Sequence, residues 1–159
     1  MTSQWLKFMA AASVVGGLLV GSAAAVADDE DDVMAVVERY AALEGDLDAQ
    51  GELIRDDRVQ IAPTRWTDNA AYMNWQAMQR EHREGLDGGK ATWIVDIESP
   101  EVRVYGDAAV VSFIRRQMIL PPGNPPVSAS PLWQTLVLVK EGRDWRIAHT
   151  HVSPVGPWN

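Results

Sequence analysis

The stretch AAVVSFIRRQMIL, residues 108–120, decides the fold class. It follows a turn at Gly106 and alternates along its length, so that one face carries Val111, Phe113 and Arg115. Side chains that repeat every second position predict a strand. The opposite face is also largely apolar, whereas the exposed face of a half-buried antiparallel strand is normally polar. Both faces of this strand are therefore expected to be covered.

Further strands are predicted before and after this stretch. They cover residues 92–99 and 101–105 on one side, and 132–140 and 144–153 on the other. The proline-rich stretch 121–126 interrupts the series because proline cannot donate to a sheet. Strands that follow one another in this way are mostly joined as hairpins, which predicts an antiparallel sheet.

The N-terminal half of the chain predicts three helices. The periodicity of apolar residues places them at about 33–45, 46–54 and 68–87, with a brief strand at 59–61 after the second. Thr67 or Asp68 is expected to cap the third helix. Helices followed by a run of strands predict an α+β fold, in which three N-terminal helices pack on one face of a curved antiparallel sheet. The uncovered sheet face then predicts a homodimer.

Length and composition exclude several classes of protein. The chain has 159 residues, which is room for one domain, and its formal net charge is -8. An acidic chain of this kind is not expected to bind nucleic acid, which requires clustered Lys and Arg. The sequence has no cysteine, so disulfides and thiolate metal sites are excluded. We expect no cofactor and no metal.

Residues 1–27 have the pattern of a secretory signal peptide. Lys7 precedes an apolar stretch, residues 8–20, and Ala25-Val26-Ala27 fits the cleavage pattern of small residues. We therefore expect a periplasmic or secreted protein with no membrane attachment after cleavage. The alternative is an uncleaved signal that anchors the chain in a membrane. The expected organisation is a signal at 1–27, an acidic tail at 28–32, one domain at 33–154 and a C-terminal tail at 155–159.

Three motifs resemble one known superfamily. They are Tyr105-Gly106-Asp107-Ala108-Ala109-Val110-Val111, continuing to Arg115; the ending Trp145-Arg146-Ile147-Ala148-His149-Thr150-His151-Val152-Ser153; and Glu44-Gly45-Asp46-Leu47-Asp48. The chain resembles the SnoaL-like, nuclear-transport-factor-2-like superfamily, nearest the branch of the calcium/calmodulin-dependent kinase II association domain. The resemblance implies a cone made by a curved sheet around helices, a pocket at its open end and dimers through the sheet. It implies no single activity, because members include enzymes and binding or assembly domains.

Arg115 is the strongest candidate for a ligand contact. It continues an apolar strand face, and the resemblance implies that the matching arginine lies in the pocket, where it is associated with small carboxylates. A guanidinium can hold a carboxylate by two parallel hydrogen bonds. A second pocket arginine of that branch corresponds to Leu136 here, so the anion clamp is incomplete. Alternatively, Arg115 pairs with a carboxylate of the protein such as Asp96.

His149 and His151 are candidates for catalysis. They are two residues apart on a predicted strand, so their side chains point to the same face. Either could serve as a general base near neutral pH, and His149 could contact a ligand. With a third ligand such as His82, Asp96 or Glu98 they could hold a metal. The simpler interpretation is that they bond loops at the end of the sheet, while Trp145 and Ile147 fill the cone from the same face.

Aromatic residues predict the walls of a pocket. Tyr72 and Trp75 lie three apart on the third helix, on a face shared with Met78 and His82, which is equally typical of core packing. Aromatic walls favour a hydrophobic ligand. Together with Arg115 and His149, the candidate ligand-binding residues are Trp66, Tyr72, Trp75, Trp93 and Gln134.

The sequence thus predicts an exported, dimeric domain that binds a small molecule, carboxylate or hydrophobic, without turning it over. The alternative is a cofactor-independent isomerase, dehydratase or cyclase that uses His149 or His151 as its base. A second alternative is an assembly module that works through the apolar sheet face.

Overall fold

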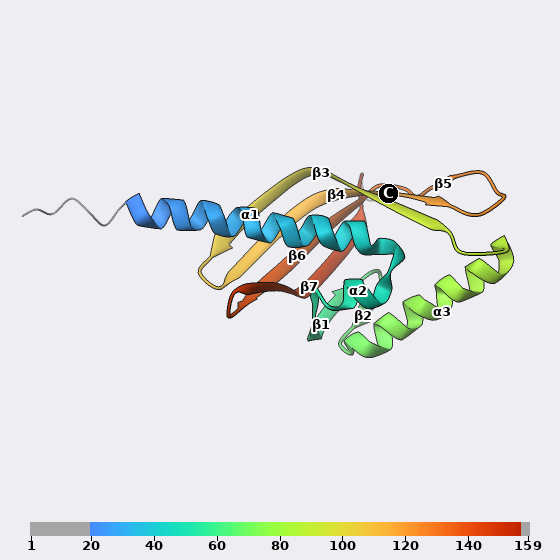
Figure 1. The fold of residues 1–159 in the computed structure, drawn as a ribbon, viewed down its shortest axis with the longest axis horizontal. Helices are drawn as coiled ribbons and strands as arrows, with labels where there is room; N and C mark the ends of the chain where they lie inside the picture. Colours follow the sequence, from blue (N-terminus) through green and yellow to red (C-terminus); the bar gives the residue numbers. More distant parts are fainter. Residues whose placement is uncertain (1–19, 157–159) are drawn as a thin grey trace, which may run out of the picture.

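The computed structural model describes residues 20–156, with side chains from residue 28 onward. Three helices and one 3₁₀ turn come first: α1 (Val20–Ala42), η1 (Leu43–Gly45), α2 (Leu47–Gly51) and α3 (Asn69–Asp87). The strands are β1 (Ile54–Ile61), β2 (Arg65–Trp66), β3 (Thr92–Tyr105), β4 (Ala108–Leu120), β5 (Val127–Ser128), β6 (Leu132–Glu141) and β7 (Asp144–Pro154). The α+β fold with its N-terminal helices and curved sheet is confirmed (Figure 1).

One strand pair departs from the expected antiparallel sheet. The strand order is β2-β1-β7-β6-β4-β3, and β5 pairs with β4. All neighbours are antiparallel except β1 and β7, which run parallel with Val59 opposite His149 and Ile61 opposite His151. The sheet is therefore mixed. A parallel pair needs a long connection, and here that connection comprises α3 and the other strands.

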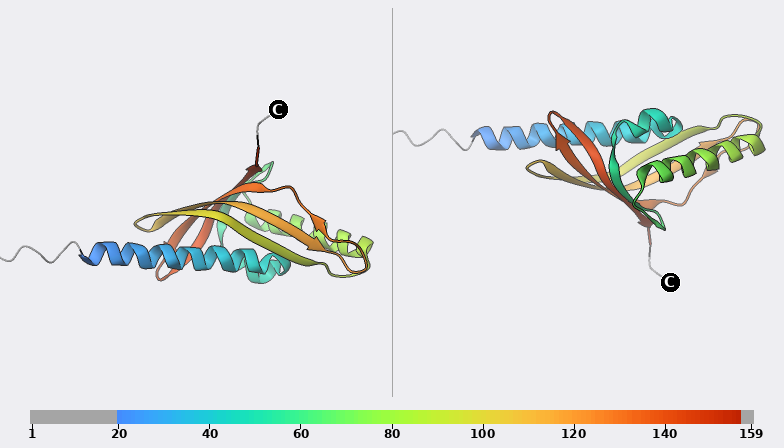
Figure 2. Two further views of the ribbon diagram at one scale, coloured as in Figure 1. Left: turned by 90° about the horizontal axis from the view of Figure 1, so that it is seen from above. Right: turned by 90° about the horizontal axis from the view of Figure 1, so that it is seen from below.

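The core lies between α1 and the inner face of the sheet. Figure 2 shows the sheet curving around this helix. Val33 and Val37, one turn apart on α1, are fully buried against the face of β4 that carries Val111 and Phe113. Leu136, Leu138 and Ile147 extend this apolar layer across β6 and β7. Residues four apart lie on one side of a helix, so Val33 and Val37 form the centre of the contact between α1 and the sheet, and Met34, Val36 and Tyr40 pack around them.

Residues 28–32 are helical instead of forming a tail before the first helix. They belong to α1, which begins at Val20, and Asp29 makes an ion pair with Lys140 on β6. Residues 1–19 of the predicted signal peptide lie outside the described residues. No helix in the described part of the chain is both long and apolar enough to span a membrane.

A bulge in β7 reverses the predicted face of the two histidines. Ile147 lies opposite Leu138 and His149 lies opposite Val137, so Ala148 is an extra residue in the ladder. Side chains alternate strictly along a strand, and one extra residue shifts that alternation. The prediction that His149 and His151 share a face with Trp145 and Ile147 is therefore wrong. The histidines lie on the outer face, while Ile147 and Thr150 lie on the inner one.

The predicted strands 92–99 and 101–105 form one strand, β3. Its register with β4 shifts between Glu98 and Glu101, where Ser99 has a φ of 52° and Pro100 offers no N–H. Pro100 therefore does not end the strand. It lies in a bulge within β3, where the pairing with β4 shifts.

The centre of the outer face of the sheet is largely apolar, and none of the described helices lies over it. It carries Val110 and Ile114 of β4 and Val137 and Val139 of β6, all partly buried among their neighbours on the sheet. Trp133 on the same face is 44% exposed. The expectation that helices cover one face only is confirmed.

Candidate functional site

A cavity of about 230 Å³ lies between the inner face of the sheet and α3. It is bounded by side chains from most elements of the fold. They are Tyr40, Glu44, Gln60, Tyr72, Trp75, Gln76, Gln79, Arg80, Trp93, Arg115, Gln117, Gln134, Thr150 and Val152. Because β4, β6 and β7 supply one wall and α3 the opposite one, the cavity exists only in the complete fold.

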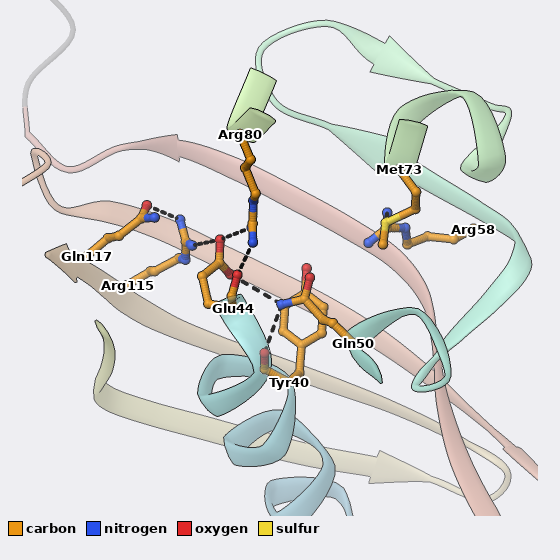
Figure 3. A network of polar contacts seen from close by, with 8 residues as sticks. All are labelled: Tyr40, Glu44, Gln50, Arg58, Met73, Arg80, Arg115 and Gln117. Atoms are coloured by element: carbon orange, nitrogen blue, oxygen red, sulfur yellow. Dashed lines mark hydrogen bonds and ion pairs between the residues drawn. The ribbon is translucent and has the colours of Figure 1, made fainter. Parts of the chain in front are cut away.

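A buried ion-pair network occupies one side of the cavity (Figure 3). Glu44 Oε1 forms an ion pair with Arg115 Nη2 at 2.9 Å and accepts a hydrogen bond from Arg80 Nη2 at 3.0 Å. Gln50 Nε2 donates to Glu44 Oε2 at 3.3 Å. The side chains of Glu44, Arg80 and Arg115 are only 8%, 12% and 15% exposed. Buried charges of this kind persist because each has a partner.

The two arginines are held by further contacts. Arg115 Nη1 donates to Gln117 Oε1 at 2.9 Å, two residues along the same strand face. Arg80 donates to the backbone carbonyl of Glu44, and its guanidinium lies 4.6 Å from the ring centroid of Trp93. Burial lowers the pKa of Arg80, and the charge of Glu44 opposes that shift. Both terminal nitrogens of each guanidinium therefore already have a partner within the protein.

Two tyrosines border the same network. Burial is the main cause that raises the pKa of Tyr72 to about 12 and also raises the pKa of Tyr40. Both phenols are therefore neutral hydrogen-bonding groups at physiological pH. Neither is poised to act as a phenolate.

The aromatic side of the cavity is a cluster around α3. The rings of Tyr72 and Trp75 stack at a centroid distance of 5.9 Å, and Trp66 of β2 lies 5.7 Å from each of them. Tyr72 is buried, whereas Trp75 is 40% exposed. Trp66 supports the two lining rings from behind without lining the cavity itself.

The floor of the cavity is polar. Gln60 of β1 and Gln134 of β6 are buried on the inner face, and Thr150 of β7 lies opposite Gln60 in the parallel ladder. Thr150 is 1% exposed, and its Oγ1 has no hydrogen-bond partner among the described residues. A buried hydroxyl without a partner destabilises the fold, and it is a site where an incoming polar atom gains a bond.

The structure brings together five of the seven predicted ligand-binding residues. Arg115, Tyr72, Trp75, Trp93 and Gln134 all line the cavity. The partner of Arg115 is Glu44, whereas the predicted alternative Asp96 is exposed and lies opposite Arg116 in the ladder.

His149 and His151 do not line the cavity. They are on the outer face of β7, opposite Val137 and Thr135 of β6. Partial burial, and secondly the neighbouring His151, lower the pKa of His149. His82, a suggested third metal ligand, is exposed on α3, and no group of three or more potential metal ligands occurs within the described residues. A base that acts inside the cavity must therefore come from another residue.

Glu44 and Arg80 are the charged residues of the cavity that sequence reasoning missed, and Gln60 and Thr150 of its floor were missed as well. Glu44 is eleven residues after Val33 and seven after Val37. If the helical periodicity of α1 is extended into η1, Glu44 lies on the same buried side as these two valines. That signal was present in the sequence. Arg80 was missed because the inner face of α3 was predicted to include Met78, which is 62% exposed, and His82. Eight residues separate Tyr72 from Arg80, so the two share the face that meets the sheet.

Comparison with known families identifies this architecture. The family model of the SnoaL-like domain matches residues 33–157. The chain therefore belongs to the SnoaL-like domain family. No match is found among curated proteins.

Solved structures with this fold cover most of the chain at low sequence identity. A nuclear-transport-factor-2-like protein with a cystatin-like fold from Novosphingobium aromaticivorans is 16% identical, with a TM-score of 0.71 over 92% of this chain and 94% of the other. The calcium/calmodulin-dependent kinase II hub homology domain of Chlamydomonas reinhardtii is 22% identical, with a TM-score of 0.59 over 87% and 100%. A candidate dehydratase from Streptomyces avermitilis is 16% identical, with a TM-score of 0.65 over 82% and 99%. These similarities establish the fold alone.

Proposed function

We propose that this protein is an exported domain that binds a small polar molecule in its cavity and releases it unchanged. The observation that supports this function is the polar floor, where Thr150 Oγ1 is buried beside Gln60 and Gln134 with no partner in the described part of the chain. Apolar packing would fill such a space if stability alone were required. Pockets with a few converging polar groups and aromatic walls are typical of small-molecule sites.

The chemistry of the cavity favours binding over turnover. Its only described carboxylate, Glu44, is held by Arg80, Arg115 and Gln50, which together engage three of its roughly four lone-pair sites. None of the described residues that line the cavity is a histidine. A general base needs a free lone pair within reach of the substrate, and these contacts leave Glu44 at most one.

The apolar outer face supports a homodimer. Val110, Ile114, Val137 and Val139 form an apolar area with Trp133, interrupted by the hydrogen-bonded Ser112–Thr135 pair, and a monomer would leave this area in water. Pairing this face with its copy buries it symmetrically. An assembly module is the second candidate, because a structure with the same fold is named as a hub domain.

The first test is native mass spectrometry of the purified protein. We expect a dimer that carries a small organic molecule, and we expect Gln134→Leu, which replaces a floor amide by a group of similar size, to lose that added mass. Thr92→Val is the matched control, because Thr92 is exposed at the start of β3 and does not line the cavity. A bare protein whose Tm does not respond to any member of a small-molecule library would contradict the binding function.

The homodimer is tested by light scattering after size-exclusion chromatography. Val137→Lys places a charge in the centre of the outer face and should yield monomers, while Ala70→Lys adds the same charge to an exposed position of α3 and should leave the dimer intact. A wild-type monomer would overturn the dimer. A larger ring or filament would favour the assembly module.

A further inference from the structure

The arginine pair in the cavity is already occupied by a carboxylate of the protein. Arg80 and Arg115 both form ion pairs with Glu44 Oε1 through one terminal nitrogen. The other terminal nitrogen donates to the Glu44 carbonyl in Arg80 and to Gln117 in Arg115. Two-point binding of a carboxylate needs a free guanidinium edge. Glu44 therefore stands where the anionic end of an acidic ligand would otherwise bind.

The remaining polar groups of the cavity are neutral. Five of the fourteen lining residues are glutamines, drawn from β1, α3, β4 and β6: Gln60, Gln76, Gln79, Gln117 and Gln134. Each primary amide offers both donors and an acceptor, and a hydroxyl offers one donor and two lone pairs. An amide can therefore donate a hydrogen bond to a hydroxyl group and can also accept one from it. Thr150 adds a hydroxyl that has no partner within the described part of the chain.

The aromatic groups supply a flat apolar surface next to these amides. Tyr72 and Trp75 stack on each other, and Trp93 is held under the guanidinium of Arg80. A ring molecule whose hydroxyls lie at its rim has apolar C–H faces, which pack well on aromatic rings. The cavity volume of about 230 Å³ is below the roughly 300–1,000 Å³ that is usual for drug-sized ligands, so a single ring is the size it can enclose.

We propose that the cavity binds a neutral polyhydroxylated ring of monosaccharide size, whose hydroxyls bond Gln60, Gln134 and Thr150 and whose C–H face packs against Trp75. This inference rests on the proposed function and specifies its ligand class. Glu44 is the residue that sets the preference, because it fills the arginine pair and repels a second carboxylate.

The test compares two sets of probes by saturation-transfer difference NMR and titration calorimetry on the purified full chain. The neutral set is D-glucose, D-galactose, D-ribose and myo-inositol, and the acidic set is acetate and benzoate. We expect at least one neutral probe to bind and the acids to bind about tenfold more weakly or not at all. Glu44→Gln should strengthen benzoate binding by about tenfold, since it removes the charge that repels a second carboxylate without changing side-chain size.

Thr150→Val tests the floor with minimal change in shape. It should weaken the neutral probe by about tenfold, while Thr92→Val should leave its affinity unchanged. Trp75→Ala, at a partly exposed position, is the second variant and should weaken the same probe even if Thr150→Val folds poorly. Circular dichroism of each variant confirms its fold.

Two results would overturn this inference in distinguishable ways. If benzoate or acetate binds the wild type more tightly than every neutral probe, the ligand class is wrong, but small-molecule binding stands. If no probe binds and native spectra show a bare protein, the proposed function fails together with the inference. Neutral-probe binding that Thr150→Val and Trp75→Ala leave unchanged would also overturn it, because that probe would then bind elsewhere.

Discussion

Arg115 Nη2 lies 2.9 Å from Glu44 Oε1, and this contact joins the inner face of β4 to the turn at the end of α1. The same carboxylate oxygen accepts from Arg80 of α3. Glu44 thus connects three elements that are distant in sequence, and it does so at the wall of the cavity. A group with this position contributes to stability as well as to ligand choice.

Glu44→Ala should destabilise the protein by about 3 kcal/mol, because it leaves two buried guanidinium groups without their counter-charge. Urea unfolding measures the change in the free energy of unfolding. Glu38→Ala, which removes an exposed carboxylate from the same helix, should change it by less than about 0.5 kcal/mol. Equal effects of the two substitutions would show that the network adds little to stability.

The N-terminus of α3 depends on Asp68. Its side chain accepts a hydrogen bond from the Ala71 backbone N–H at 2.9 Å, so Asp68→Ala should cost about 1 kcal/mol of stability. Thr67 is the other N-cap residue that the sequence predicted. Thr67→Ala removes its hydroxyl and should have little effect, because Asp68 makes the capping hydrogen bond. The midpoint of thermal unfolding distinguishes the two, and a greater loss for Thr67→Ala would contradict the assignment.

Two glycines should respond to alanine in opposite ways. Gly142 has a φ of 67° in the turn between β6 and β7, so Gly142→Ala should destabilise the protein by about 1 kcal/mol. Gly85 lies within α3, and a Cβ there would meet no atom within 4 Å. Gly85→Ala should therefore stabilise the protein by about 0.5–1 kcal/mol. Thermal melts of both variants give the sign directly.

The stability of the protein should decrease as the pH falls below about 6.5. The pKa of His149 is lower in the folded state than in the unfolded state, so the unfolded chain binds more protons in that range. The stabilisation by neutral His149 is fully present above the unfolded pKa and is lost as pH falls through the folded pKa. His149→Gln should flatten this part of the curve of unfolding free energy against pH. If His149→Gln leaves the pH dependence of stability unchanged, that dependence must come from other titratable groups.

The fold was predictable because its strongest signals are local. The alternation in β4 and β6 is regular over ten residues or more, and the valine stripe of α1 needs only helical periodicity. The bulge at Ala148 could not be predicted in this way, because an extra residue in β7 is defined only by its pairing with β6. That single residue decided which face the histidines occupy.

The candidate site was predictable in part for a related reason. Arg115 and Gln134 lie on strand faces whose phase is fixed by their apolar neighbours, so their inward direction follows from the alternation. The inner face of α3 does not follow from such a pattern, since this helix presents two glutamines and Arg80 to the cavity and Met78 to solvent. Polar faces that line a cavity lack the hydrophobic signal on which helix predictions depend.

The parallel pair of β1 and β7 has a consequence for how the chain folds. Val59 and His149 are neighbours in the sheet although about 90 residues separate them, so this contact closes a loop that contains most of the domain. Contacts of such long range carry a large entropic cost and slow the search for the native state. The hairpin of β3 and β4 can form early from adjacent residues, whereas β1 must wait for the last strand to be available. The polar floor, to which Gln60 and Thr150 belong, is therefore among the last parts of the protein to assemble.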